Sequence, residues 1–326
     1  MNATRRQIVR AALALPACAV AAAPPAAPWP SRPVHLIVVY PPGGVSDAMA
    51  RTLAEPLAQA LGVPVVVENR GGAGGALGME VLARAAPDGC TLAFSAVSPL
   101  TLQPLLAGGP RDLLGSVIPV AGVMNTPVLV AGTPAFTGHS FGDLIAQARA
   151  RPGELRWATS GIATSGHMVL AQTRLQSGVD ITHVPYQGGG PQINDALGGQ
   201  FEVLSTNVAA AQLQLLSAGR LKALAVGAPT RLDALPQVPT LAELGYPQAN
   251  IGSLFGLFAP AGTPAAVVAR LNAEVGRLLA SDAVASRLRE SHNLPAGGTQ
   301  QDFARQIAAE RRRNQELVKR SGGLLS

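Results

Sequence analysis

Residues 34–70 read VHLIVVYPPGGVSDAMARTLAEPLAQALGVPVVVENR, and this stretch carries the pattern of an α/β fold. The apolar, β-branched run over 34–40 predicts a buried strand. After the turn residues at 41–44, Met49, Leu53, Leu57 and Leu61 recur every four residues, which predicts a helix with one apolar face. Residues 63–68 predict a second strand. Strand, helix and strand in this order indicate a parallel sheet flanked by helices.

The same alternation continues along the chain. Further strands are predicted over 91–95, 128–131, 157–160, 183–186, 201–205 and 223–226, and helices over 76–86, 141–150 and 166–176. Thr263 and Pro264 predict the start of a late helix, with threonine as its cap and proline in its first turn. A last helix is expected to contain Phe303, Ile307 and Leu317. The chain therefore alternates strands and helices almost from end to end.

Length and charge bound the class of protein. A chain of 326 residues that is 48% hydrophobic is long enough for two domains. The formal charge of +6 falls to +3 without Arg5, Arg6 and Arg10, which lie in the N-terminal leader described below. The remaining basic cluster, residues 311–313, is better explained as a solvated helix face than as a phosphate-binding stripe. Nucleic-acid binding is therefore not expected.

The N-terminus has the pattern of an export signal. A basic head over 4–10 precedes an apolar stretch over 11–23, and small residues at 19–21 offer a cleavage site. The apolar run is too short for a membrane span of about 20 residues. We therefore expect a signal peptide over 1–23, with Arg5 and Arg6 suggesting the twin-arginine route. Whether Cys18 is lipidated stays open, and Cys90 is expected to be a small buried residue.

Motifs that could indicate an enzyme fail on their context. The glycine-rich residues 71–78 lack the spacing of a dinucleotide loop and predict a tight turn that packs a helix on the sheet. Residues 138–142, GHSFG, match a hydrolase motif, but five residues separate them from the preceding strand, so Ser140 and Asp143 are expected to cap a helix. The five histidines have no metal-ligand spacing. We expect no catalytic residue, no metal and no cofactor; a secreted serine hydrolase is the weaker alternative.

Loops rich in glycine and hydroxyl groups remain, each where a strand gives way to a helix. They cover residues 42–47, 160–167 and 186–190. Ligands of open α/β sheets bind at the carboxyl ends of strands, where helix N-termini suit an anion. None of these loops contains lysine or arginine. The sequence therefore predicts an anion held by neutral donors, and the candidate ligand-binding residues are Pro42, Gly43, Gly44, Ser46, Asp47, Ser95, Ser160, Gly161, Thr164, Ser165, His167, Tyr186, Gly188, Gly189 and Asp195.

These loops belong to an ordered set of motifs that resembles the Bug-type substrate-binding receptors of tripartite tricarboxylate transporters. The resemblance runs from about residue 30 to near the C-terminus. It is carried by residues 41–44 with Asp47 and Arg51, 67–70 with 72–75, 87–89 with 91–92, 160–161 with Thr164 and His167, 183–186 with Gly188, Asp195 with 198–200, and 223–226 with Arg231, 239–240 and Glu243.

The resemblance implies a periplasmic protein of two-lobed clamshell fold, each lobe a mostly parallel sheet flanked by helices, that closes on a ligand. Residues 28–128 and 252–326 would form the first lobe, and residues 129–251 the second. The ligand would be a small carboxylate, the partner the membrane permease subunits of the transporter, and the receptor a monomer. A sensory receptor that presents its ligand to a signalling protein would share this fold and site, so that alternative stays open.

Overall fold

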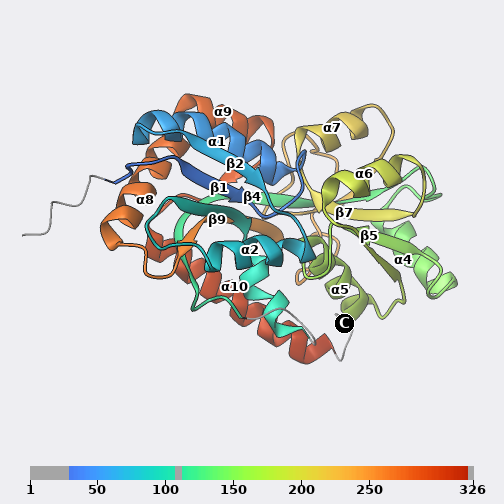
Figure 1. Ribbon diagram of the computed structural model, residues 1–326. Coiled ribbons are helices and arrows are strands. Elements are labelled where there is room, and N and C mark those ends of the chain that lie inside the picture. The colour runs from blue at the N-terminus through green and yellow to red at the C-terminus, as the bar shows by residue number, and fades with distance from the viewer. Residues whose placement is uncertain (1–28, 107–111, 322–326) are drawn as a thin grey trace, which may run out of the picture.

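The computed structural model describes residues 29–106 and 112–321, which form two lobes side by side (Figure 1). The expected signal peptide, residues 1–23, lies outside the described residues. One lobe combines segments from both ends of the described chain, and the middle of the chain builds the other, as the colours of Figure 1 show. The predicted α/β clamshell is confirmed, and the expected boundaries of the lobes, 28–128 with 252–326 and 129–251, stay a prediction.

The first lobe is a mixed sheet covered by helices on both faces. Strand β1 pairs in parallel with β2 and β3, and β3 pairs antiparallel with β9, which pairs antiparallel with β4. The strands are β1 (Val34–Val38), β2 (Val65–Asn69), β3 (Thr91–Ala96), β4 (Val117–Gly132), β9 (Gly252–Pro260) and β10 (Leu294–Pro295). The helices are α1 (Val45–Leu61), α2 (Ala76–Ala83), α3 (Ser98–Thr101), α8 (Ala265–Ala280), α9 (Asp282–Glu290) and α10 (Gln300–Ser321), with short 3₁₀ turns over Ala73–Gly75 and Gln103–Leu105.

The second lobe repeats this layering with fewer strands. Strand β5 pairs in parallel with β6 and β7, and the end of β4 pairs antiparallel with β7 and β8. The strands are β5 (Arg156–Thr159), β6 (Thr182–Pro185), β7 (Val203–Asn207) and β8 (Lys222–Gly227), and the helices are α4 (Phe141–Ala150), α5 (Ser165–Ser177), α6 (Gly189–Leu197) and α7 (Ala210–Ser217). Parallel pairing thus lies on the side of each lobe away from β4.

Strand β4 joins the lobes because it changes its partners along its length. From Val117 to Pro127 it pairs with β9, and from Val128 to Gly132 it pairs with β7 and β8. The chain returns to the first lobe where β9 starts at Gly252. Two crossings of extended chain therefore connect the lobes, which is the arrangement of a hinge.

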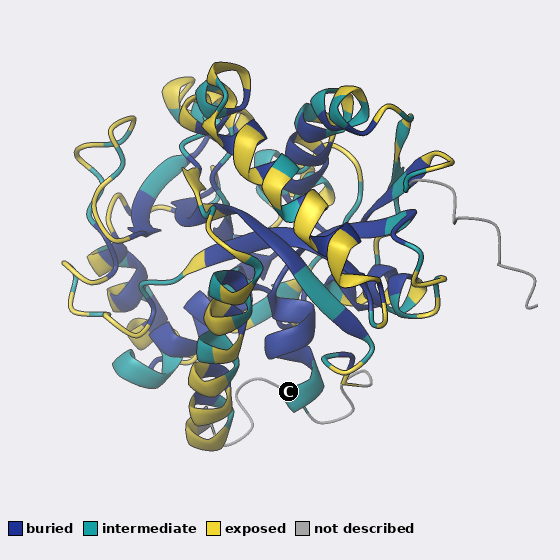
Figure 2. Cartoon of the chain, turned by 90° about the vertical axis from the view of Figure 1, so that its left-hand side faces the viewer, coloured by how far each residue is buried: buried dark blue, intermediate teal, exposed yellow. Residues whose placement is uncertain are grey.

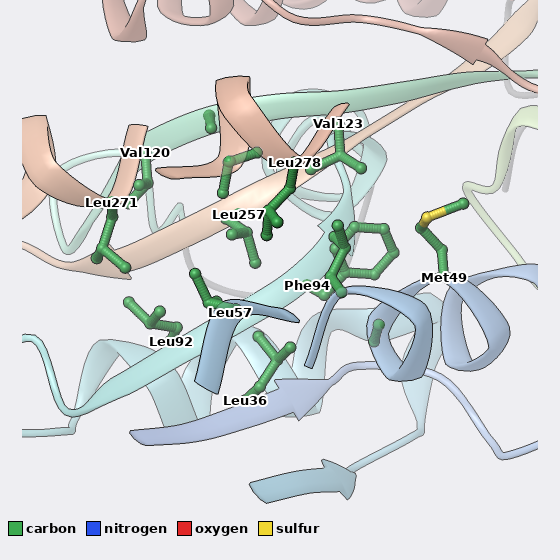
Figure 3. Close-up of a cluster of buried hydrophobic side chains, with 14 of the residues drawn as sticks. Leu36, Met49, Leu57, Leu92, Phe94, Val120, Val123, Leu257, Leu271 and Leu278 are labelled. Carbon is green, nitrogen blue, oxygen red and sulfur yellow. The ribbon is translucent and has the colours of Figure 1, made fainter. Parts of the chain in front are cut away.

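Apolar periodicity accounts for the core of the first lobe. Met49, Leu53, Leu57 and Leu61 are buried, as the sequence predicts, and they belong to one cluster with strand residues such as Leu36 and Phe94 (Figure 3). Figure 2 shows buried strands between helices whose outer faces are exposed. Separate clusters fill the second lobe, and one further cluster joins Leu102 and Leu317 to Met168 across the two lobes.

Two expectations about local structure need correction. The late helix starts at Ala265 with Pro264 as its N-cap, so Thr263 does not cap it; the Thr263 hydroxyl instead donates to Pro260 O at 2.8 Å. The strand predicted over 128–131 is not separate but lies near the end of the longer β4, which runs from Val117 to Gly132. Within residues 29–106 and 112–321, no helix has the length and apolarity that a membrane crossing requires.

Candidate functional site

A cleft of about 210 Å³ lies where the carboxyl ends of β1, β3, β5, β6 and β7 meet β9. Both lobes contribute to it, which is the position at which open α/β sheets bind ligands. The residues that line it are Tyr40, Pro41, Gly43, Gly44, Val45, Ser46, Ala96, Ser98, Ser160, Thr164, Ser165, Gly166, Gly189, Gly190, Ile193, Asn194, Thr206, Asn207, Ala209, Ala211, Gln212, Ser253 and Phe255.

Besides the four-residue α3, which starts at Ser98, four longer helices begin at the cleft, namely α1, α5, α6 and α7. The N-caps of α1, α6 and α7 are Gly44, Gly188 and Ala209, and none of them accepts a side-chain hydrogen bond from its helix. The first N–H groups of a helix have no partner within that helix and carry partial positive charge. The helix starts therefore present a set of unsatisfied N–H donors to one small volume, which favours an anion.

The lining itself carries no formal charge. Among the residues that line the cleft in the described chain, none is Asp, Glu, Lys, Arg or His. Hydroxyl and amide side chains supply the polarity, from Ser46, Ser98, Ser160, Ser165, Thr206, Asn207 and others of the lining set. An anion in this cleft would therefore be held by dipoles and hydrogen bonds rather than by an ion pair.

The first predicted loop lies partly in the cleft. Gly43, Gly44 and Ser46 line it, whereas Pro42 and Asp47 do not. The Asp47 carboxylate accepts from Gly43 N at 3.1 Å, from Arg51 Nε at 3.0 Å and from Asn69 Nδ2 at 3.0 Å. Burial alone would raise the pKa of Asp47, but these hydrogen bonds outweigh it and lower the pKa. Asp47 is thus ionised, and its carboxylate fixes the backbone of this loop at Gly43 from outside the cleft.

The second predicted loop supplies Ser160, Thr164 and Ser165 to the cleft lining. Its other two candidates, Gly161 and His167, do not line the cleft and support the loop instead. The Thr164 hydroxyl donates to Gly161 O at 2.8 Å and accepts from His167 N at 3.4 Å, which makes Thr164 the N-cap of α5. Nδ1 of the buried His167 accepts from Ala163 N at 3.0 Å. Gly161 and His167 therefore lie outside the lining and set the shape of this loop.

The third predicted loop contributes Gly189, while Tyr186, Gly188 and Asp195 do not line the cleft. The Tyr186 hydroxyl donates to Asp195 Oδ2 at 2.7 Å, so these two side chains pair with each other. Burial and the Asp195 carboxylate raise the pKa of Tyr186 to about 12. Ser95, the last candidate, is fully buried, and its hydroxyl donates to Ala96 O at 2.7 Å.

Sequence reasoning missed two further parts of the cleft. Thr206, Asn207 and Gln212 surround the passage from β7 to α7, and Ser253 and Phe255 come from the crossing strand β9. The Ser253 hydroxyl donates to Asn207 Oδ1 at 2.7 Å, which ties these parts together. Thr206 and Asn207 are polar residues at a strand end, the same signal that identified the other loops. Ser253 has no comparable local signal.

The motifs set aside in the sequence have structural roles. Ser140 and Asp143 form a capping box at the start of α4, with the Ser140 hydroxyl accepting from Asp143 N at 3.1 Å. A Cβ on Gly78 would lie 2.7 Å from the Val39 side chain, so this glycine allows α2 to pack closely on the sheet. Cys90 is a buried free cysteine. All three observations confirm the predicted structural roles.

Known proteins resemble this chain over nearly its whole length. Residues 49–323 match the model of the tripartite tricarboxylate transporter family receptor. The protein BugT of Bordetella pertussis is 36% identical over 327 residues, covering 100% of both chains. A solved structure described as a periplasmic transporter is 36% identical, with a TM-score of 0.86 over 91% of this chain and 100% of its own.

Two solved relatives carry ligands. A protein of R. palustris determined with adipate is 33% identical, with a TM-score of 0.84 over 90% of this chain and 98% of its own. MatC of Rhodopseudomonas palustris, with bound malate, is 30% identical, with a TM-score of 0.82 over 89% of this chain and 100% of its own. Both ligands are dicarboxylates.

Proposed function

The chain belongs to the receptor family of tripartite tricarboxylate transporters, and we propose that it captures a small carboxylate in the cleft between its lobes and delivers it to the membrane permease of such a transporter. The observation that carries the ligand class is the cleft itself, where the starts of α1, α5, α6 and α7 meet in a lining without formal charge. Adipate and malate in two relatives fit the same chemistry.

The neutral lining explains how a receptor can hold an anion and still release it. A hydrogen bond to a charged group contributes roughly 1.5–3 kcal/mol, and several converging N–H groups and hydroxyls supply affinity together. A buried ion pair would add the desolvation of a second charged group. Reopening of the lobes would return water to the donors and free the ligand.

The remaining parts of the proposal follow from the family. The receptor would act in the periplasm as a monomer, after export by the signal over residues 1–23 through the twin-arginine route, and would carry out no chemistry on its ligand. The lobes would be residues 28–128 with 252–326 and residues 129–251. Motion would occur where β4 changes partners after Pro127 and where the chain returns at Gly252.

Calorimetry with a panel of carboxylates tests this proposal. The panel contains succinate, malate, adipate, citrate and aromatic acids, and each binder is paired with its uncharged amide as a matched control. We expect at least one acid to bind while its amide does not, because the amide lacks the charge that the helix starts favour. Equal binding of acid and amide, or binding of uncharged or cationic solutes alone, would contradict the proposal.

A further inference from the structure

Among the residues that the structure describes, one glutamine of the cleft has a buried side-chain oxygen without a hydrogen-bond partner. Gln212 lies in the first turn of α7, lines the cleft and is 9% exposed. Its Oε1 atom is buried without a partner in the part of the chain that the structure describes. Other buried amides differ from it: Gln192 has a free Oε1 too, but its Nε2 donates to Ala158 O and Ser205 O, and it lies outside the cleft.

An unpaired buried amide oxygen is unusual because burying it without a hydrogen bond is unfavourable. In the core, such an atom reduces stability. In a ligand cleft, it is an acceptor that a bound molecule can satisfy. Gln212 is the lining residue in which burial and a free acceptor coincide among the described residues.

The other amide side chains of the cleft do not offer this acceptor. Asn207 Oδ1 already accepts from the Ser253 hydroxyl at 2.7 Å. Asn194 is exposed, so water competes for it. The helix starts supply N–H groups, which donate to a carboxylate and cannot accept from a ligand. Hydroxyl groups of the lining can donate to the carboxylate or accept, whereas Gln212 Oε1 can only accept, and among the described residues it is the lining atom that is buried without a partner.

We propose that Gln212 selects carboxylates that also carry a hydrogen-bond donor, a hydroxyl or an ammonium group, over the same acids without one. This inference rests on the proposed function and narrows its ligand class to hydroxy and amino acids. A site with a buried polar group discriminates against a ligand that leaves that group unpaired. In this arrangement the converging N–H groups bind the carboxylate. The side-chain oxygen of Gln212 accepts a hydrogen bond from the hydroxyl or ammonium group of the same ligand.

Matched acids test this selection. The C4 set is succinate, malate and aspartate, which carry hydrogen, hydroxyl and ammonium at the same carbon; the corresponding C5 and C6 sets extend it. With wild-type protein, calorimetry should give about 10-fold tighter binding for the hydroxy or amino acid than for the plain acid of the same length. In Gln212→Met, which keeps length and loses the amide, this difference should disappear, because the hydroxy or amino acid loses the partner of its donor group.

Gln214→Met is the control, because Gln214 is exposed on the same helix and lies outside the cleft; it should keep the preference. The wild-type comparison alone overturns the inference if a plain acid binds as tightly as its hydroxy and amino counterparts. So does a preference that persists in Gln212→Met. Absence of binding by every acid in all sets is a different result, because it overturns the proposed function and this inference with it.

Discussion

The imidazole rings of His167 and His183 are stacked, with their centroids 4.2 Å apart and their planes 8° apart. Both rings support the second loop of the cleft. His167 Nδ1 accepts from Ala163 N at 3.0 Å, and Nε2 of His183 lies 2.7 Å from the Thr159 hydroxyl. Because Nδ1 of His167 is an acceptor, the ring is neutral with its proton on Nε2, and protonation at Nδ1 would break the bond to the loop.

On acidification, the protein should therefore unfold at a higher pH than protonation of its carboxylates alone would cause. Burial lowers the pKa of His167 to about 3, with the charges of His183 and Arg174 adding to the effect, and burial lowers that of His183 to about 4. Unfolded histidine takes up a proton below about pH 6.5, so the unfolded state binds more protons and stability falls as the pH drops toward these values. The slope is about 1.4 kcal/mol per pH unit for each neutral histidine, and less for the partly exposed His183.

Urea unfolding between about pH 6 and pH 4.5 measures this slope, because most carboxylates stay ionised there. His167→Asn keeps an acceptor near the position of Nδ1 and removes the titration, so the dependence on pH should become flatter. His139→Asn, at an exposed position, is the control, and His167→Asn should flatten the slope more than this control does. The same slope in wild type and His167→Asn would refute this role for the buried ring.

Loss of the Thr164 hydroxyl should act on the loop and on the start of α5. The structure directs its hydrogen to Gly161 O, and its oxygen caps His167 N. Thr164→Val should lower the free energy of unfolding by about 1 kcal/mol. Thr164→Ser keeps the capping hydroxyl and should therefore lose much less stability. Thr52→Val is the control, since the half-buried Thr52 donates to the Ala48 carbonyl within α1 and caps no helix. Equal losses at Thr164 and Thr52 in thermal unfolding would exclude the cap as the cause.

The sequence predicts the fold where structure follows from local periodicity. The four-residue spacing of Met49, Leu53, Leu57 and Leu61 gives α1 its buried face whatever surrounds it. Strand β4 is different, because Pro119 and Pro127 lie within it and its two ends pair with strands of different lobes. Its length is set by long-range pairing, and a short window of sequence contains no signal for that.

The residues of the cleft likewise fall into those that a local sequence pattern identifies and those that only long-range pairing brings there. Glycine and hydroxyl groups at strand ends identify Gly43, Ser160 and Gly189 from the sequence, because a strand end followed by a helix start is a local pattern. Gln212 and Ser253 reach the cleft through the order of strands in the sheet, which brings β7 and β9 to either side of β4. Asp47 and His167 carry polar groups in the right loops, yet their side chains bond the loops from behind.

The two lobes approach each other closely at a glycine that lies outside the cleft lining. Gly74, in the first lobe, has φ 60° and ψ 21°. A Cβ on Gly74 would collide with the Gln103 side chain of its own lobe and would also lie 2.7 Å from Ile162 O in the second lobe, closer than a Cβ normally approaches backbone. Gly178, the C-cap of α5, has nearly the same conformation, with φ 68° and ψ 14°, but a Cβ there would meet nothing within 4 Å. The two sites therefore share the left-handed backbone, but only at Gly74 would a side chain meet neighbours, Gln103 in its own lobe and Ile162 in the other.

Alanine at Gly74 should hold the lobes apart. Gly178→Ala should lose about 1 kcal/mol of stability, because it places an L-residue in the left-handed region, and Gly74→Ala should lose more, because its Cβ also displaces the Gln103 amide from Ala73 O. Only Gly74→Ala introduces a collision with the opposite lobe, so it should bind the best carboxylate of the calorimetric panel more weakly and keep a larger radius of gyration with that ligand in small-angle scattering. Gly178→Ala should bind and contract as the wild type does. If Gly74→Ala contracts and binds like Gly178→Ala, then the contact between Gly74 and Ile162 is not part of closure, and the contacts that limit closure must lie elsewhere between the lobes.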